Sequence, residues 1–156
     1  MKKTDKSFYL IERISIGTTS DASILKPLPM ELLRFKSEYT YLFSIMYSFK
    51  ANPATNFSQL YNLPNIVRRF LETFSAFKYL STHNIDENIE RLIKDVVKCE
   101  RVRKFVHYHS HSLSTNKLLH LLDPTECRDV IEILLCAIEK SDLEHFTALI
   151  AEVTTP

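Results

Sequence analysis

The chain has 156 residues, of which 45% are hydrophobic and 25% are charged, so it can fold around a core of its own. The formal net charge is +1, which gives no overall preference for nucleic acid. A single glycine, Gly17, argues against glycine-rich phosphate loops, tight hairpins and β-sandwiches. Because neither a Walker A nor a G-x-G-x-x-G pattern is present, the chain has no recognisable nucleotide site, and we expect no cofactor.

Residues 8–16, FYLIERISI, are rich in aromatic and β-branched types, which predicts a β-strand. Residues 17–28 have the composition of a linker, and no second strand is predicted. A lone strand leaves backbone groups unpaired, so it must pair with another chain, a weaker strand of this chain, or part of a larger protein. We therefore divide the chain into an extended segment and linker at 1–28 and a helical domain at 29–156, and expect it to be a fragment or standalone remnant.

Apolar residues after position 28 recur at spacings of three and four, which is typical of amphipathic helices. Pro29 suits the first turn of a helix that reaches about residue 50. A break at Pro53 precedes a central helix that we expect to begin at or near Pro64, after a turn at 57–61.

The remaining helices are indicated by their first residues. Asn84, Asp123 and Ser141 resemble capping residues, and Pro124 suits the first helical position. Another helical stretch begins at about Glu100, with the basic residues that follow it exposed. The sequence therefore predicts an all-α fold, a compact bundle of about six helices with an extended, strand-like N-terminal segment.

The central helix, LPNIVRRFLETFSAF at residues 63–77, has the strongest amphipathic pattern. Its apolar face consists of Leu63, Val67, Phe70, Leu71, Phe74 and Phe77. On the opposite face, the spacing of Arg68 and Glu72 places a cation and a carboxylate one turn apart. They are either a surface ion pair worth a few tenths of a kcal/mol, or two groups of a catalytic site.

Three histidines, His107, His109 and His111, follow one another at alternate positions. On a helix His107 and His111 share a face, and on a strand all three align. A metal site needs more ligands than these, and no further ligand cluster is evident, so we predict no metal. The alternatives are a solvated helix end and a proton carrier near neutral pH.

A histidine from this turn, packed beside the polar face of the central helix, would meet Arg68 and Glu72. Such a set suits attack by a ribose 2′-hydroxyl on phosphate. The arginine neutralises the developing charge, and the glutamate and histidine orient or exchange protons.

The cysteine pattern and the N-terminus favour a reducing compartment. Cys99, Cys127 and Cys136 form no C-x-x-C pair, and MKKTDK is not followed by the apolar segment of a secretion signal. We expect a cytoplasmic protein with free thiols, two of which, Cys127 and Cys136, lie in the core. Charged residues interrupt every apolar run, so no membrane interaction is predicted.

Three short motifs lie between residues 37 and 112, and the resemblance that they carry covers most of residues 8–150. They are Ser37-Glu38-Tyr39 with Leu42-Phe43, Leu63-Pro64-Asn65 with Arg68-Arg69 and Leu71-Glu72, and Ser110-His111-Ser112. In this order they resemble the C-terminal region of a group of bacterial AAA/ABC-type, SMC-like ATPases that includes the anticodon nucleases. In intact relatives an ATPase core with Walker motifs precedes this region, and the strand at 8–16 would close the edge of its sheet.

The resemblance implies a helical ribonuclease unit of the HEPN type that cleaves tRNA or another RNA without a metal and takes part in defence against phage. The catalytic groups that it implies are Arg68, Glu72 and His111. Since the Walker motifs are absent, we expect no ATPase activity from this chain. The alternative function is a non-catalytic interaction or regulatory module that pairs with a separate ATPase subunit or with itself.

Overall fold

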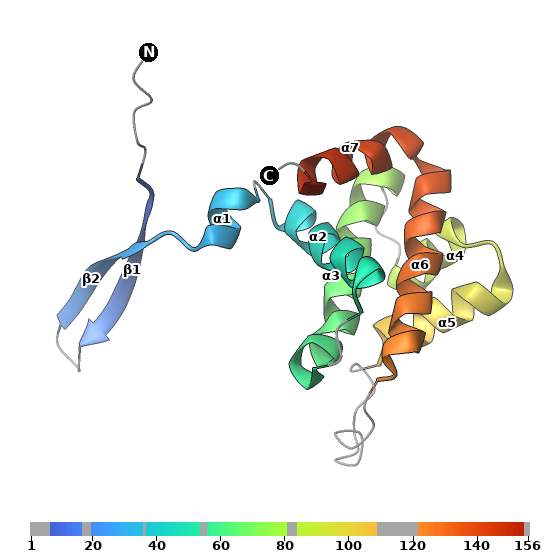
Figure 1. Cartoon of the computed structure of the whole chain (residues 1–156), viewed down its shortest axis with the longest axis horizontal. Helices are drawn as coiled ribbons and strands as arrows, with labels where there is room; N and C mark the ends of the chain where they lie inside the picture. The colour runs from blue at the N-terminus through green and yellow to red at the C-terminus, as the bar shows by residue number, and fades with distance from the viewer. Residues whose placement is uncertain are drawn as a thin grey trace. The chain divides into compact units, whose positions relative to one another are not determined.

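The computed structural model describes residues 7–16, 20–35, 37–53, 56–80, 84–108 and 122–154 (Figure 1). The chain divides into two units, Met1–Glu38 and Tyr39–Pro156. The described residues form one two-stranded sheet and seven helices, which confirms the predicted, mostly helical fold. The helices are α1 Met30–Arg34, α2 Glu38–Ala51, α3 Phe57–Tyr79, α4 Ile85–Leu92, α5 Val96–Val106, α6 Pro124–Ser141 and α7 Leu143–Thr154.

The first unit contains a β-hairpin. Strand β1, Tyr9–Ile16, confirms the predicted strand and pairs antiparallel with β2, Ser20–Pro27. The prediction of a linker is therefore wrong for residues 20–27, and the partner of β1 is a weaker strand of the same chain. Strand β2 reads SDASILKP, in which serine, aspartate, lysine and proline are disfavoured in strands, so pairing with β1 rather than local preference determines its conformation.

The hairpin and α1 have no core of their own. Among residues 7–35, no described side chain is buried, and every residue of α1 is at least partly exposed. The predicted continuous helix over 29–50 is also wrong, because Phe35 adopts an extended conformation at φ −105° and ψ 123° and ends α1. Leu32 and Leu33 are 58% and 45% exposed, so α1 buries neither of these leucines.

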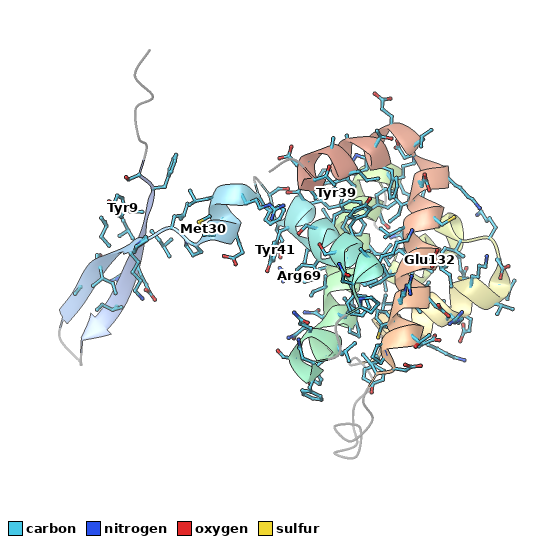
Figure 2. The ribbon with its side chains drawn as sticks, in the orientation of Figure 1. Tyr9, Met30, Tyr39, Tyr41, Arg69 and Glu132 are labelled. Atoms are coloured by element: carbon cyan, nitrogen blue, oxygen red, sulfur yellow. The ribbon has the colours of Figure 1, made fainter. Side chains whose placement is uncertain are left out.

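The second unit is a helical bundle with α3 at its centre. Helix α3 packs against α4, α5 and α6, and α6 also packs against α5 and α7. The ring of Tyr39 on α2 lies among these helices in Figure 2 and stacks on Phe70 of α3 at a centroid distance of 4.7 Å. The side chains buried in α3 are Leu60, Leu63, Pro64, Val67, Phe70, Leu71, Phe74 and Ser75.

Two predictions for α3 are wrong. The helix begins at Phe57 instead of near Pro64, because Asn56 caps it and accepts a hydrogen bond from the N–H of Gln59 at 2.9 Å. Pro64 lies inside the helix, where its missing N–H costs one hydrogen bond but its ring is buried. Phe77 is 72% exposed, because the last turn of α3 carries it past the core that Phe74 still reaches.

The capping predictions are partly confirmed. Asn84 and Asp123 cap α4 and α6 through hydrogen bonds from backbone N–H groups, as predicted. Helix α5 begins at Val96, capped by Asp95, which is earlier than expected. Asp142, and not Ser141, caps α7, because α6 extends through Ser141. Within the described residues, none of the helices has both the length and the apolar composition needed to cross a bilayer.

Candidate functional site

The polar face of α3 carries the first two predicted site residues. Arg68 Nε donates a hydrogen bond to Glu72 Oε1 at 2.9 Å, one turn along the helix. The side chains are 34% and 49% exposed, so both remain accessible to a ligand from solvent. The structure thus brings the two groups together on an open surface, and their catalytic role stays a prediction.

The predicted third residue, His111, lies outside the described residues, and so does His109. His107 is described and lies at the C-terminal end of α5, where its backbone N–H bonds to the carbonyl of Arg103 at 3.1 Å. Among the residues that the structure describes, no group of three or more His, Cys, Asp and Glu side chains is arranged to hold a metal ion. A metal site that uses His109 or His111 is not tested by this result.

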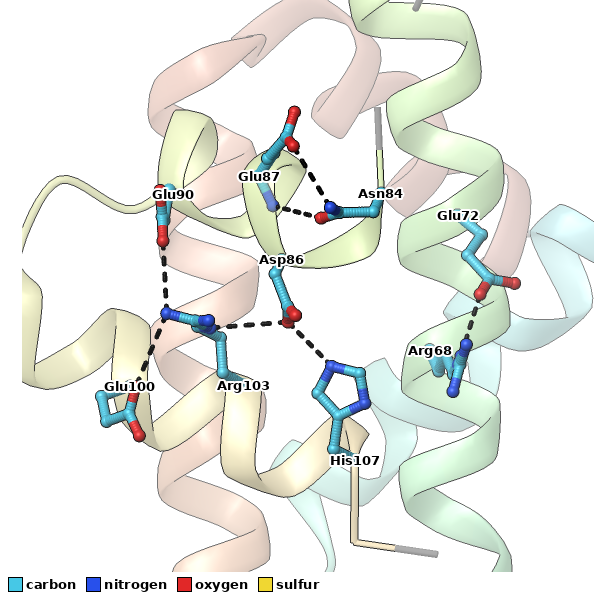
Figure 3. A network of polar contacts seen from close by, with 9 residues as sticks. All are labelled: Arg68, Glu72, Asn84, Asp86, Glu87, Glu90, Glu100, Arg103 and His107. Carbon is cyan, nitrogen blue, oxygen red and sulfur yellow. Dashed lines mark hydrogen bonds and ion pairs between the residues drawn. The ribbon is translucent and has the colours of Figure 1, made fainter. Parts of the chain in front are cut away.

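His107 is held by a polar network between α4 and α5. Its Nε2 lies 2.7 Å from Asp86 Oδ1, and Asp86 also lies 3.4 Å from Arg103 Nε. Arg103 Nη1 extends the network to Glu90 on α4 at 3.2 Å. Figure 3 shows the imidazole of His107 between Asp86 and the turn of α3 that carries Arg68.

The network fixes the charge of Asp86 and the tautomer of His107. Partial burial raises the pKa of Asp86, but the hydrogen bond from His107 and the positive charges of His107 and Arg103 outweigh it and leave the pKa below its ordinary value. An ionised carboxylate only accepts hydrogen bonds, so Nε2 of His107 must donate to it. In the neutral form of the ring, Nδ1 is then the nitrogen that can accept a hydrogen bond, and the contact with Asp86 holds the ring in place.

Sequence reasoning missed Asp86 and Arg103 as partners of the histidine. Asp86 and His107 are 21 positions apart on different helices, and no local pattern joins them. Arg101 and Arg103 were expected to be exposed, but they are only partly so, because each forms ion pairs between helices. Arg101 donates to Glu126 of α6, so that carboxylate serves the packing of α5 on α6.

Comparisons with known proteins give one family. The model of a family described as an AAA domain matches residues 1–136, which is most of the chain and includes both the hairpin and α3 to α5. No curated protein matches the chain, and neither does any solved structure. The match supports the coarse part of the resemblance seen in the sequence, the relation to AAA-type ATPases.

Proposed function

The chain belongs to the AAA-domain family, and on this premise we propose that it is a non-hydrolysing module that docks on a separate AAA-type ATPase core through its N-terminal hairpin. With Gly17 as its one glycine, the chain cannot supply the glycine-rich Walker A loop that holds nucleotide phosphates. The nucleotide-binding core of an ATPase of this type therefore lies outside these 156 residues, and that core is the partner that we assign to the hairpin.

The observation that carries this proposal is the apolar face of the hairpin. Side chains alternate along a strand, so Tyr9 and Ile11 share a face, and Leu25 lies on it because it pairs with Ile11. These three side chains are 56%, 69% and 63% exposed. The opposite face is mixed, since Leu10, Ile14 and Ile24 lie on it beside the ion pair between Glu12 and Lys26. Among the described side chains of the strands, these three are the most exposed of the large apolar ones, Tyr9, Ile11 and Leu25, and we call the face that carries them the apolar face.

The energetics favour a partner for this face. An isolated two-stranded hairpin is marginally stable in water and needs packing on one face. Covering the remaining exposed area of Tyr9, Ile11 and Leu25 would contribute about 4 kcal/mol, taking roughly 2 kcal/mol for full burial of each side chain. In addition, the outer edges of β1 and β2 can add to the edge of a second sheet through main-chain hydrogen bonds.

The test is capture of the partner with a matched pair of variants. The tagged chain is cross-linked in its own cells and purified, and the captured proteins are identified by mass spectrometry. We expect a protein with Walker A and Walker B motifs. Leu25→Asp should abolish its capture, because Leu25 lies on the apolar face. Lys26→Gln should not, because Lys26 lies on the opposite face of β2. The two residues are adjacent and both substitutions shift the net charge equally, so Lys26→Gln is a matched control.

Two results would contradict docking by the hairpin. One is the absence of any Walker-containing protein from the wild-type sample. The other is equal capture of such a protein by wild type and by Leu25→Asp. An unrelated protein in the sample would not support the proposal, since the partner is specified by its nucleotide-binding motifs.

A second candidate function is metal-independent RNA cleavage, and the position of His107 favours it. The Asp86–His107 pair and the Arg68–Glu72 pair lie on neighbouring helices, and Figure 3 shows the imidazole on the side of α5 toward Arg68. In such a reaction a base takes the proton of the ribose 2′-hydroxyl, whose oxygen attacks the adjacent phosphorus. The bond to the 5′-oxygen breaks, that oxygen is protonated, and a 2′,3′-cyclic phosphate remains.

In this proposal the guanidinium of Arg68 stabilises the charge on the phosphate, and Glu72 acts as base or acid. The family resemblance implies His111 as the histidine, and the described residues offer His107, oriented by Asp86. A role in defence against phage belongs to the same proposal and is tested by the plating efficiency of phage on cells with and without the gene.

The nuclease is tested by incubating the chain with total tRNA in EDTA, with and without the captured ATPase. We expect products that end in a cyclic phosphate, and at least a tenfold loss of rate in Glu72→Ala, of the order seen for general acids and bases. His107→Ala and His111→Ala identify the histidine, and Glu144→Ala, an exposed carboxylate on α7, is the control. Absence of cleavage in both conditions, or equal rates in all variants, would refute this candidate.

A further inference from the structure

The helical unit also contains a pocket whose residues take no part in the two proposed functions. It has a volume of about 470 Å³ and lies between the end of α4, the start of α5 and the second half of α6. None of Arg68, Glu72 and His107 lines it. The volume is within the range of small-molecule sites in proteins, roughly 300 to 1,000 Å³.

The rim of the pocket is strongly cationic. Four basic side chains line it, those of Arg91, Lys94, Lys98 and Lys140, against one carboxylate, Asp95. Asp95 already caps α5 through the N–H of Lys98 at 3.0 Å. Among the described residues, no carboxylate forms an ion pair with the ammonium group of Lys98 or Lys140. Lys98 and Lys140 therefore bring positive charge to the pocket without a paired carboxylate from the described residues, and a bound anion stabilises that charge.

The wall of the pocket is apolar. Ile93, which is 6% exposed, lines it, and Leu92, Ile133 and Ala137 add aliphatic surface. An inorganic anion would fill only part of this volume, whereas an ester with a flat or apolar body would contact both wall and rim. Lysines act as point charges toward phosphate, and several of them suit a doubly charged group better than a carboxylate.

We propose that this pocket binds a phosphate ester of nucleotide size, with the phosphate between Lys98 and Lys140 and the apolar body against Ile93 and Ile133. The phosphate ester comes either from a free nucleotide or from a nucleotide of an RNA strand, and the experiment below separates the two. The proposal does not depend on catalysis at α3 or on docking of the hairpin.

The thiol of Cys136 can report whether the pocket is occupied. It lines the pocket and is partly exposed, whereas Cys99 and Cys127 are 6% and 0% exposed. Burial raises the pKa of Cys127 to about 11 and also raises that of Cys99, so their thiolates are scarce at neutral pH. Alkylation by iodoacetamide, followed on the Cys136 peptide by mass spectrometry, therefore measures access to the pocket in the full chain.

The probes are AMP, adenosine, inorganic phosphate and a short single-stranded RNA. We expect AMP to slow alkylation of Cys136, by roughly tenfold at about ten times its Kd. Adenosine should protect much less, since it lacks the phosphate. Stronger protection by the RNA than by AMP assigns the site to RNA, and the reverse assigns it to a free nucleotide.

Lysine variants test whether AMP protects Cys136 by binding in the pocket. Lys98→Gln and Lys140→Gln, both exposed positions, should each weaken protection by AMP, measured against the unprotected rate of the same variant. Lys104→Gln, on α5 but outside the pocket, should leave it unchanged. The proposal is overturned if neither AMP nor RNA protects Cys136, if adenosine protects as well as AMP, or if protection survives in both pocket variants.

Discussion

The helical bundle buries its apolar side chains, whereas the hairpin leaves similar side chains exposed. Residues 39–154 bury the apolar faces of their helices, and every described buried hydrophobic side chain belongs to this part of the chain. In the hairpin, Ile11 and Leu25 lie opposite each other and stay largely exposed. The comparison teaches that the free energy of folding resides in the bundle, whereas the apolar residues of the hairpin are available for binding.

The largest expected effect tests the bundle side of this comparison. Phe70 is fully buried and stacks on Tyr39, so Phe70→Ala should lower the free energy of unfolding by about 3 to 5 kcal/mol. Phe77→Ala, on the same helix but 72% exposed, is the control and should cost less than about 0.5 kcal/mol. Urea denaturation followed by circular dichroism measures both, and equal losses would mean that Phe77 is covered in solution.

A smaller effect is expected at the link between α4 and α5. Asp86→Asn removes the charged partner of His107 and Arg103 and should cost about 1 kcal/mol at pH 7, a value reduced for the solvent exposure of the pair. Because the pKa of Asp86 is lowered in the folded state, its contribution is present above about pH 3.9 and is lost as the pH falls through the folded pKa.

Urea titrations between pH 2 and pH 7 measure this dependence. The difference in stability between wild type and Asp86→Asn should disappear at the acidic end. Glu144→Gln, which alters an exposed carboxylate of α7, is the matched control and should leave the profile unchanged. A difference that is constant across the whole range would show that packing of the side chain, and not its charge, is responsible.

The ion pair on α3 should matter little for stability. Arg68→Gln is expected to cost about 0.3 to 0.5 kcal/mol, as for other exposed pairs one helical turn apart, and most of this should vanish in 1 M salt. A double-mutant cycle with Glu72→Gln measures the coupling. A coupling above about 1 kcal/mol would indicate that the pair is structural, which would weaken its assignment to a catalytic site.

The smallest effect on stability is expected in the hairpin. Ile11→Asp should change the free energy of unfolding of the bundle by less than about 0.5 kcal/mol, because no core is built on this side chain. The same variant should lose binding to the ATPase partner. A large loss of stability would show that the apolar face is covered by the chain itself, which removes the basis for the docking proposal.

Local rules account for what the sequence could predict. The contact between Arg68 and Glu72 follows from one turn of helix, and the cap at Asn84 involves residues three apart. Strand β1 was found because its aromatic and β-branched residues favour extended backbone on their own. Each of these features depends on neighbours within a few positions, which a sequence displays directly.

The misses are features that depend on distant residues. Strand β2 forms by pairing with β1, although Ser20, Asp21 and Pro27 disfavour it locally. Pro64 continues α3 because burial on the bundle side offsets the missing hydrogen bond. Asp86 meets His107 only because α4 and α5 pack together, so the part of the candidate site that orients the histidine lay beyond prediction.

The hairpin also bears on how this chain behaves before it meets a partner. Strand edges are templates for fibrils, and an apolar hairpin with two open edges is an aggregation hazard. In β1 the charged pair Glu12 and Arg13 interrupts the apolar stretch, and in β2 Lys26 and Pro27 follow Leu25 directly. Charged residues and prolines beside an apolar strand slow cross-β stacking. In the docking proposal, these residues keep the newly made chain from stacking into fibrils before the hairpin reaches the ATPase core.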